Sequence, residues 1–180
     1  MNGFVAPDRI KTERLVLRVS TLNDAAAIFE RYGQDPEVTR YLTWRPHESL
    51  ERTRAFLQRC SAVRQSGDAF TWVLTLEGDD SAVGMLELRP VRHRAEVGYV
   101  LARPYWSRGY MTEALRAVVG WTLAQPELYR VWAVCDVENL ASARVLEKGG
   151  FQHEGILRRW LVHPNRSTEP RDCLCYAIVK

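Results

Sequence analysis

The residues best suited to chemistry surround a glycine that opens a helix. Residues 95–101 read as a strand, Pro104 breaks it, and apolar residues return at helical spacing after Gly109. The first amides of such a helix have no carbonyl one turn before them, and the helix dipole adds positive potential there. Because glycine has no Cβ, the main chain can also approach a ligand closely. The junction therefore predicts an anion site suited to phosphate, although an ordinary strand-to-helix turn has the same composition.

The composition is that of a folded domain with a mild positive charge. Of its 180 residues, 46% are hydrophobic and 26% charged, and the formal net charge is +3. This charge suits an anionic ligand but is too small to indicate nucleic acid binding. The start of the chain lacks an apolar signal segment, no stretch is apolar enough to span a membrane, and the four cysteines lack metal-type spacing. We therefore expect a cytoplasmic protein that binds no metal.

The elements that must position the junction alternate along the chain. Strands are predicted at residues 14–19, 70–76, 82–88, 94–101, 130–135, 151–162 and 173–179. Helices are predicted at residues 22–32, 38–42, 49–65, 110–125 and 139–148. This order predicts one α+β (mixed α/β) domain over residues 1–180, with a mixed sheet flanked by helices. Residues 1–9 are expected to form a loose N-terminal arm.

Three segments carry a resemblance to a known family. They are Tyr-Trp-Ser-Arg-Gly-Tyr-Met-Thr-Glu-Ala at 105–114, Asn-Leu-Ala-Ser at 139–142 and Glu-Lys-Gly-Gly-Phe at 147–151. In this order and spacing they resemble the GNAT superfamily of acetyltransferases, and most of all its ribosomal-protein N-terminal acetyltransferase (RimJ/RimL-like) branch. Residues 12–18 and Arg171-Asp172 with Tyr176 also resemble that branch. The resemblance implies a splayed mixed sheet that takes acetyl-coenzyme A where its central strands part.

The resemblance also implies where the coenzyme binds. The family's loop pattern is Gln/Arg-x-x-Gly-x-Gly/Ala, and this chain has Trp106, Gly109 and Met111 at those positions, so only the central glycine agrees. Such loops bind phosphate through main-chain N–H groups, so the side-chain departures cost little. The residues implied to contact the coenzyme are Val100, Leu101, Arg108, Gly109, Tyr110, Met111, Thr112, Asn139 and Ser142. A helix N-cap alone would explain Asn139 equally well.

Acetyl transfer to an amine needs a base, a polarised thioester carbonyl and a route for the thiolate to leave. Glu96 is the first candidate for the base and Glu87, on the neighbouring strand, the second, although either could be a surface residue of an alternating strand. A main-chain N–H near Val100 would hold the thioester oxygen. Ser142 is the branch-type candidate to assist the thiolate, and Tyr105 is an alternative because many members use a tyrosine. The cysteines lie in no nucleophile motif, so we expect direct transfer in a ternary complex.

The acceptor is the least defined part of the reaction. An α-amino group titrates near ~8 and a lysine near ~10.4, so a protein N-terminus is the easier nucleophile at neutral pH. Trp44 and Arg45 lie in the loop where this fold meets its acceptor, with packing and solvation as alternative roles. We expect a monomeric or homodimeric N-acetyltransferase for a protein N-terminus of the ribosomal-protein type. The alternatives are an acetyltransferase for a small amine (an antibiotic or a polyamine) and a coenzyme-A-binding module without turnover.

Overall fold

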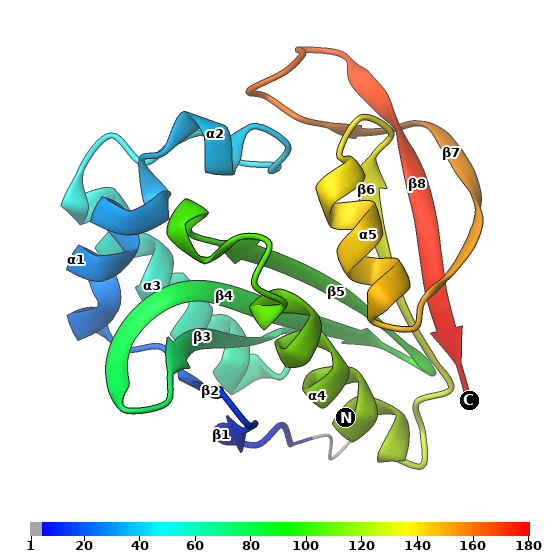
Figure 1. Cartoon of the computed structure of the whole chain (residues 1–180), viewed down its shortest axis with the longest axis horizontal. Helices are drawn as coiled ribbons and strands as arrows, with labels where there is room; N and C mark the ends of the chain where they lie inside the picture. Colours follow the sequence, from blue (N-terminus) through cyan, green and yellow to red (C-terminus); the bar gives the residue numbers. More distant parts are fainter. Residues whose placement is uncertain (1–4) are drawn as a thin grey trace.

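A sheet of eight strands runs through the computed structural model, which describes residues 5–180 (Figure 1). The strand order is β1-β2-β3-β4-β5-β6-β8-β7, and every neighbouring pair is antiparallel except β5 and β6. The strands are β1 (Arg9–Lys11), β2 (Leu15–Val19), β3 (Phe70–Leu76), β4 (Asp79–Val91), β5 (Arg94–Leu101), β6 (Arg130–Asp136), β7 (Gln152–Val162) and β8 (Pro170–Val179). The mixed α/β fold expected from the sequence is confirmed.

Helices cover both faces of this sheet (Figure 1). They are α1 (Ala25–Ile28), α2 (Pro36–Thr39), α3 (Leu50–Ser66), α4 (Tyr110–Ala124) and α5 (Leu140–Lys148). The single helix predicted over residues 22–32 forms three short pieces, a 3-10 turn at Leu22–Asp24, α1, and a π-helical turn at Phe29–Gly33. Between residues 5 and 180, no helix has both the length and the apolar character needed to cross a bilayer.

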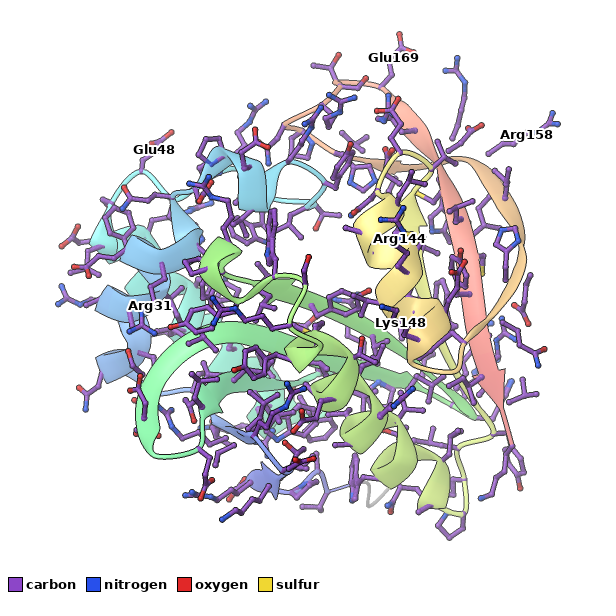
Figure 2. The ribbon with its side chains drawn as sticks, viewed as in Figure 1. Arg31, Glu48, Arg144, Lys148, Arg158 and Glu169 are labelled. Atoms are coloured by element: carbon purple, nitrogen blue, oxygen red, sulfur yellow. The ribbon has the colours of Figure 1, made fainter. Side chains whose placement is uncertain are left out.

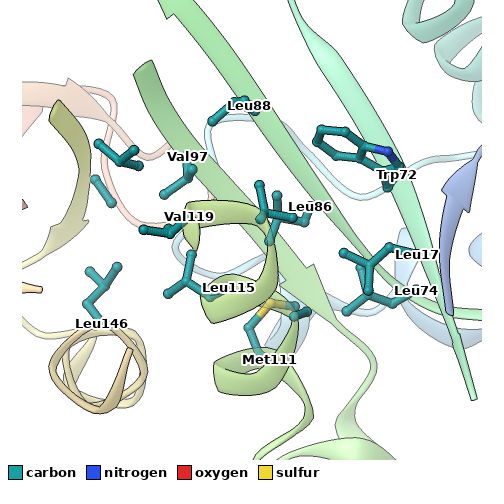
Figure 3. Packing of buried hydrophobic residues seen from close by; sticks show 14 of the residues in the cluster. Leu17, Trp72, Leu74, Leu86, Leu88, Val97, Met111, Leu115, Val119 and Leu146 are labelled. Carbon is teal, nitrogen blue, oxygen red and sulfur yellow. The ribbon is translucent and has the colours of Figure 1, made fainter. Parts of the chain in front are cut away.

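The helix α4 is fixed to the sheet by an apolar face. Its buried side chains pack against those of β4 and β5 (Figure 3). Leu115 and Val118 of α4 are fully buried there, as is Leu86 of β4. Burial of each such side chain contributes roughly 1.5–3 kcal/mol, so the contact holds the whole helix and its N-terminus in place.

The two central strands pair over a short distance and then part. β5 and β6 run parallel and are in register only at Arg94↔Arg130, Ala95↔Val131 and Glu96↔Trp132. β5 continues to Leu101 and β6 to Asp136 without further pairing to each other. Figure 1 shows the two strands diverging from their shared end. The region beyond Glu96 and Trp132 is called the splay below. It leaves one side of each strand without a neighbouring strand to bind its main-chain groups.

The N-terminal segment is held more firmly than expected. Ala6 is buried, and the carbonyl oxygen of Pro7 accepts hydrogen bonds from Trp72 Nε1 at 2.8 Å and Arg64 Nη2 at 3.0 Å. The prediction of a loose arm is therefore wrong from Ala6 onward, because two side chains from distant elements bind its main chain. The part of that arm at residues 1–4 lies outside the described residues.

We predict that Gly84→Ala destabilises the sheet beside the splay. Gly84 of β4 lies opposite Leu101 of β5, and a Cβ on residue 84 would stand 2.6 Å from the Val100 carbonyl oxygen. The strands would have to separate, and we expect urea unfolding to show a loss of about 2 kcal/mol in the free energy of unfolding. The control is Gly120→Ala inside α4, where a Cβ meets no atom within 4 Å and should add up to about 1 kcal/mol. Unchanged stability of Gly84→Ala would contradict this account.

Candidate active site

The loop between β5 and α4 presents unpaired main-chain amides. Ser107 and Gly109 both have left-handed backbone conformations, with φ of 60° and 80°. The hydrogen bonds of α4 begin at Glu113, whose amide donates to the Gly109 carbonyl oxygen at 3.0 Å. The N–H groups of Tyr110, Met111 and Thr112 precede it and have no carbonyl one turn back. These amides and the positive end of α4 have the arrangement that suits an anion, and the anion site stays a prediction.

A salt bridge from the start of the chain fastens this loop. Arg14 Nε lies 2.7 Å from Glu113 Oε2, and Arg14 Nη1 donates to the Arg108 carbonyl oxygen at 3.0 Å. The guanidinium also lies 4.7 Å from the ring centroid of Tyr110. Thr12 Oγ1 donates to Glu113 Oε1 at 2.6 Å. Burial opposes ionisation of Glu113, but the bonds from Thr12 and Arg14 outweigh it and lower its pKa.

The register of β5 shows which of its amides face the splay. Ala102 N donates to the Val83 oxygen of β4 at 2.9 Å. Because antiparallel ladders alternate, Val100 also turns its main-chain groups toward β4, whereas Tyr99 and Leu101 turn theirs toward the splay. The Leu101 oxygen already accepts a bond from Trp106 Nε1 at 2.6 Å. The amides near Val100 that can meet a ligand in the splay are therefore those of Tyr99 and Leu101.

The other side of the splay is formed by β6 and the start of α5. Asn139 Oδ1 accepts from the Ser142 amide at 3.2 Å, so Asn139 acts as an N-cap here. The Ser142 hydroxyl lies 2.8 Å from the Tyr99 hydroxyl of β5, and this contact joins the two sides of the splay. Tyr105 does not approach Ser142 in this way, since its hydroxyl lies 3.4 Å from Arg31 Nη1. Tyr99 is thus the tyrosine that sequence reasoning missed.

The exposed face of α5 is basic. Arg144 and Lys148 project from the helix, as Figure 2 shows, while Ala143 and Leu146 are buried against the sheet. The helix therefore has an apolar side that fixes it beside β6 and a positive side next to the splay.

The two candidate bases are bridged by one arginine. Arg89 Nη2 lies 3.2 Å from Glu96 Oε1, and Arg89 Nη1 forms an ion pair with Glu87. The three side chains lie on the face of the sheet that carries Met85 and packs against α1 and α3. Gly98 lies directly opposite Glu87, and the space left by its missing side chain is bordered by the Arg89 guanidinium. Glu96 is also the last residue of β5 that pairs with β6, so its carboxylate stands where the splay begins.

The loop predicted to meet the acceptor is held by a distant hairpin. Asn165, between β7 and β8, donates from Nδ2 to the carbonyl oxygens of Thr39 at 2.7 Å and Trp44 at 2.8 Å. The Trp44 ring lies 5.0 Å from the His47 ring, which supports packing as one role of Trp44. Arg45 is exposed. No local pattern in the sequence indicates the role of Asn165, because its partners lie more than a hundred residues away.

A charged cluster around the buried Asp136 anchors the same hairpin to the end of β6. Arg171 Nε lies 2.5 Å from Asp136 Oδ2, and Arg171 Nη2 lies 2.9 Å from Glu138 Oε1. Burial opposes ionisation of Asp136, but the bond from Arg171 contributes to a net lowering of its pKa. Burial also lowers the pKa of His163, whose Nε2 lies 3.8 Å from Asp136 Oδ2. The cluster gives Arg171, which carries part of the family resemblance, a structural role.

A mixed sheet with two parting parallel strands and free helix amides at their open end agrees with the arrangement that the family resemblance implies for a coenzyme-dependent acyltransferase. The family profile described as Acetyltransferase (GNAT) domain matches residues 14–152. This chain belongs to the GNAT family of acetyltransferases and is an acetyl-CoA-dependent N-acetyltransferase.

Its relatives include named and uncharacterised enzymes. The chain is 34% identical to the uncharacterized N-acetyltransferase YoaA of Bacillus subtilis, over 95% of this chain and 96% of that protein. It is 30% identical to the ribosomal-protein-serine acetyltransferase of Escherichia coli, over 62% of this chain and 63% of that protein. The crystal structure of a GNAT-family acetyltransferase from Bacillus anthracis matches with a TM-score of 0.83 at 30% identity, covering 95% of this chain and 98% of that chain.

We predict that Glu113→Gln unfolds more easily in a pH-dependent way. The pKa of Glu113 is lower in the folded state than in the unfolded chain. The stability that its ionised carboxylate contributes is therefore complete above the pKa of the unfolded chain, and it is lost as the pH falls through the pKa of the folded state. At pH 7 the variant should lose about 1–2 kcal/mol of unfolding free energy in urea, and the difference should shrink below about pH 4. The exposed Glu127→Gln is the control and should behave like wild type. A pH-independent difference would contradict the role of the ionised carboxylate.

Proposed function

We propose that this chain acetylates protein N-termini of the ribosomal-protein type, with β5 carrying both the coenzyme contacts and the base. The observation that supports this proposal most is the placement of β5. Its far end turns main-chain groups into the splay beside the free amides of α4, and Glu96 stands where the splay begins. The ribosomal-protein-serine acetyltransferase among the relatives supports the choice of acceptor.

The free main-chain groups fit acetyl-CoA. The pyrophosphate would bind the amides of residues 109–112 and the nearby Arg108, because left-handed Gly109 brings the chain close without a side chain. The pantetheine arm would extend along Val100 and Leu101 on one side and Asn139 and Ser142 on the other. An amide N–H of β5 directed into the splay would donate a hydrogen bond to the thioester oxygen and so stabilise its developing negative charge. Acetyl-CoA supplies the activated acetyl group as co-substrate.

In the proposed reaction the neutral amine attacks the thioester carbon, the N–C bond forms and the C–S bond breaks. Glu96 takes the amine's proton, directly or through a water. Its neighbour Arg89 orients this carboxylate, while Glu87 shares the same guanidinium and balances part of its charge. The Ser142 hydroxyl donates a hydrogen bond to the departing thiolate. A protein N-terminus fits this scheme because its amine is more readily neutral than that of lysine.

We predict that Glu96→Gln lowers kcat/KM about 100-fold in an assay of thiol release from acetyl-CoA with N-terminal peptides. The amide keeps the size of the side chain but accepts no proton. Glu87→Gln is the matched control, because it breaks the other half of the Arg89 bridge, and it should lose much less. Aminoglycosides and polyamines belong in the same acceptor panel, and preference for one of them would reject the N-terminal acceptor. Release of no thiol with any acceptor would reject the transferase reaction itself.

We also predict that Asn165→Ala raises the KM for the peptide about fivefold to tenfold. The variant loses two hydrogen bonds, each worth about 1 kcal/mol, to the loop that carries Trp44 and Arg45. The KM for acetyl-CoA should stay unchanged, since the loop of α4 is not affected. Ser167→Ala in the same hairpin is the control, because its hydroxyl accepts from the nearby Glu169 amide and not from the loop that carries Trp44, as far as the described residues show. An equal rise in both KM values would show a general disturbance of the fold.

A further inference from the structure

Tyr99 has one hydroxyl hydrogen and two acceptors within reach. Its oxygen lies 2.8 Å from Ser142 Oγ and 3.2 Å from the Ser142 carbonyl oxygen. If Tyr99 donates to the carbonyl, its oxygen is left to accept from the serine, and the serine hydrogen points at the tyrosine. If Tyr99 donates to Oγ, the serine hydrogen is free to point elsewhere. The 2.8 Å contact is present in both arrangements, so the partner of the serine hydrogen decides between them.

A sulfur atom already occupies the other side of Ser142. The serine hydroxyl hydrogen-bonds the thiol of Cys135, which lies on β6 beyond the last residue that pairs with β5. Burial raises the pKa of this thiol to about 12, and the bond from Ser142 opposes that rise. A serine that donates to this sulfur has its own oxygen left to accept from Tyr99. The hydroxyls then form a chain that runs from Tyr99 through Ser142 to sulfur.

We propose that Tyr99 is a positioning residue, whose phenol donates to Ser142 Oγ and so leaves the serine hydrogen free to turn from the Cys135 thiol to the departing coenzyme thiolate. This inference rests on the proposed function, because it assigns the orientation of the group that assists the thiolate. Donation from Tyr99 also strengthens the donor capacity of Ser142, since consecutive hydrogen bonds polarise one another. The sequence left a tyrosine as an alternative to Ser142, whereas here a different tyrosine acts through it.

Tyr99 orients the serine without giving up its own proton. Burial raises the pKa of its phenol well above the ordinary value, and the bond with Ser142 offsets this only in part. Tyr99 is thus a neutral donor throughout the pH range of the reaction. The proton that finally reaches the coenzyme sulfur comes from solvent after the C–S bond has broken, so no charge remains on the tyrosine.

The test measures the single-turnover rate of acetyl transfer with saturating acetyl-CoA and peptide. Tyr99→Phe removes one oxygen atom and should slow this rate about tenfold while the KM for acetyl-CoA changes less than twofold. The matched control is Tyr176→Phe on β8, whose hydroxyl donates to Glu147 at 3.0 Å instead, and it should keep the wild-type rate. Ser142→Ala should lose at least as much as Tyr99→Phe. The double variant should be no slower than Ser142→Ala, because the tyrosine has no other route to the thiolate.

The outcomes separate this inference from the proposed function. A wild-type rate in Tyr99→Phe, alongside a slow Ser142→Ala, would overturn the role of Tyr99 and leave the transferase reaction intact. Losses that multiply in the double variant would also overturn it, because the two residues would then act independently. A loss of coenzyme affinity without a change in rate would assign Tyr99 a purely structural role.

Discussion

The early parting of β5 and β6 is the constraint on which the rest of the site depends. Two parallel strands that pair with each other at only three positions leave the main-chain groups that face the splay without a strand to bind. A ligand with its own amide groups, such as the pantetheine arm of coenzyme A, can bind those groups in place of a strand. The same parting brings Glu96 to the point where the sheet opens and sets the start of α5 across from β5. The proposed coenzyme contacts, base and thiolate partner thus follow from one feature of the sheet.

The site is held open by contacts from parts of the chain that are far apart in sequence. Arg14, just before β2, binds Glu113 and fastens the loop of α4, while Asn165 binds the main chain of the acceptor loop. Arg14 forms charged hydrogen bonds to a carboxylate, and Asn165 donates two hydrogen bonds to main-chain carbonyl groups. Paired contacts of this kind fix the orientation of the partner as well as its distance. Neither residue is proposed to touch the reacting atoms. Their role is to give an irregular backbone one geometry, which an anion site made of amides requires.

The charge around the proposed base, Glu96, depends on an arginine that it shares with Glu87. Arg89 stands between Glu87 and Glu96, so the two carboxylates together with the guanidinium carry one net negative charge instead of two. One carboxylate can then accept a proton while the other keeps the arginine in place. The sequence ranked Glu96 before Glu87 as the candidate base but did not show that the two glutamates share one arginine. Their positions relative to the splay make them different.

The sequence by itself determined the fold class, the loop at Gly109 and the order of the elements. These follow from local features, namely the apolar periodicity of α4, a glycine in a left-handed turn and an N-cap at Asn139. Only the tertiary structure decided which side chains meet, including Tyr99 with Ser142 and Arg89 with both glutamates. Periodicity records the face on which a residue lies. The register of strands and the partners of long polar side chains are set by packing across the sheet, which no short stretch of sequence encodes.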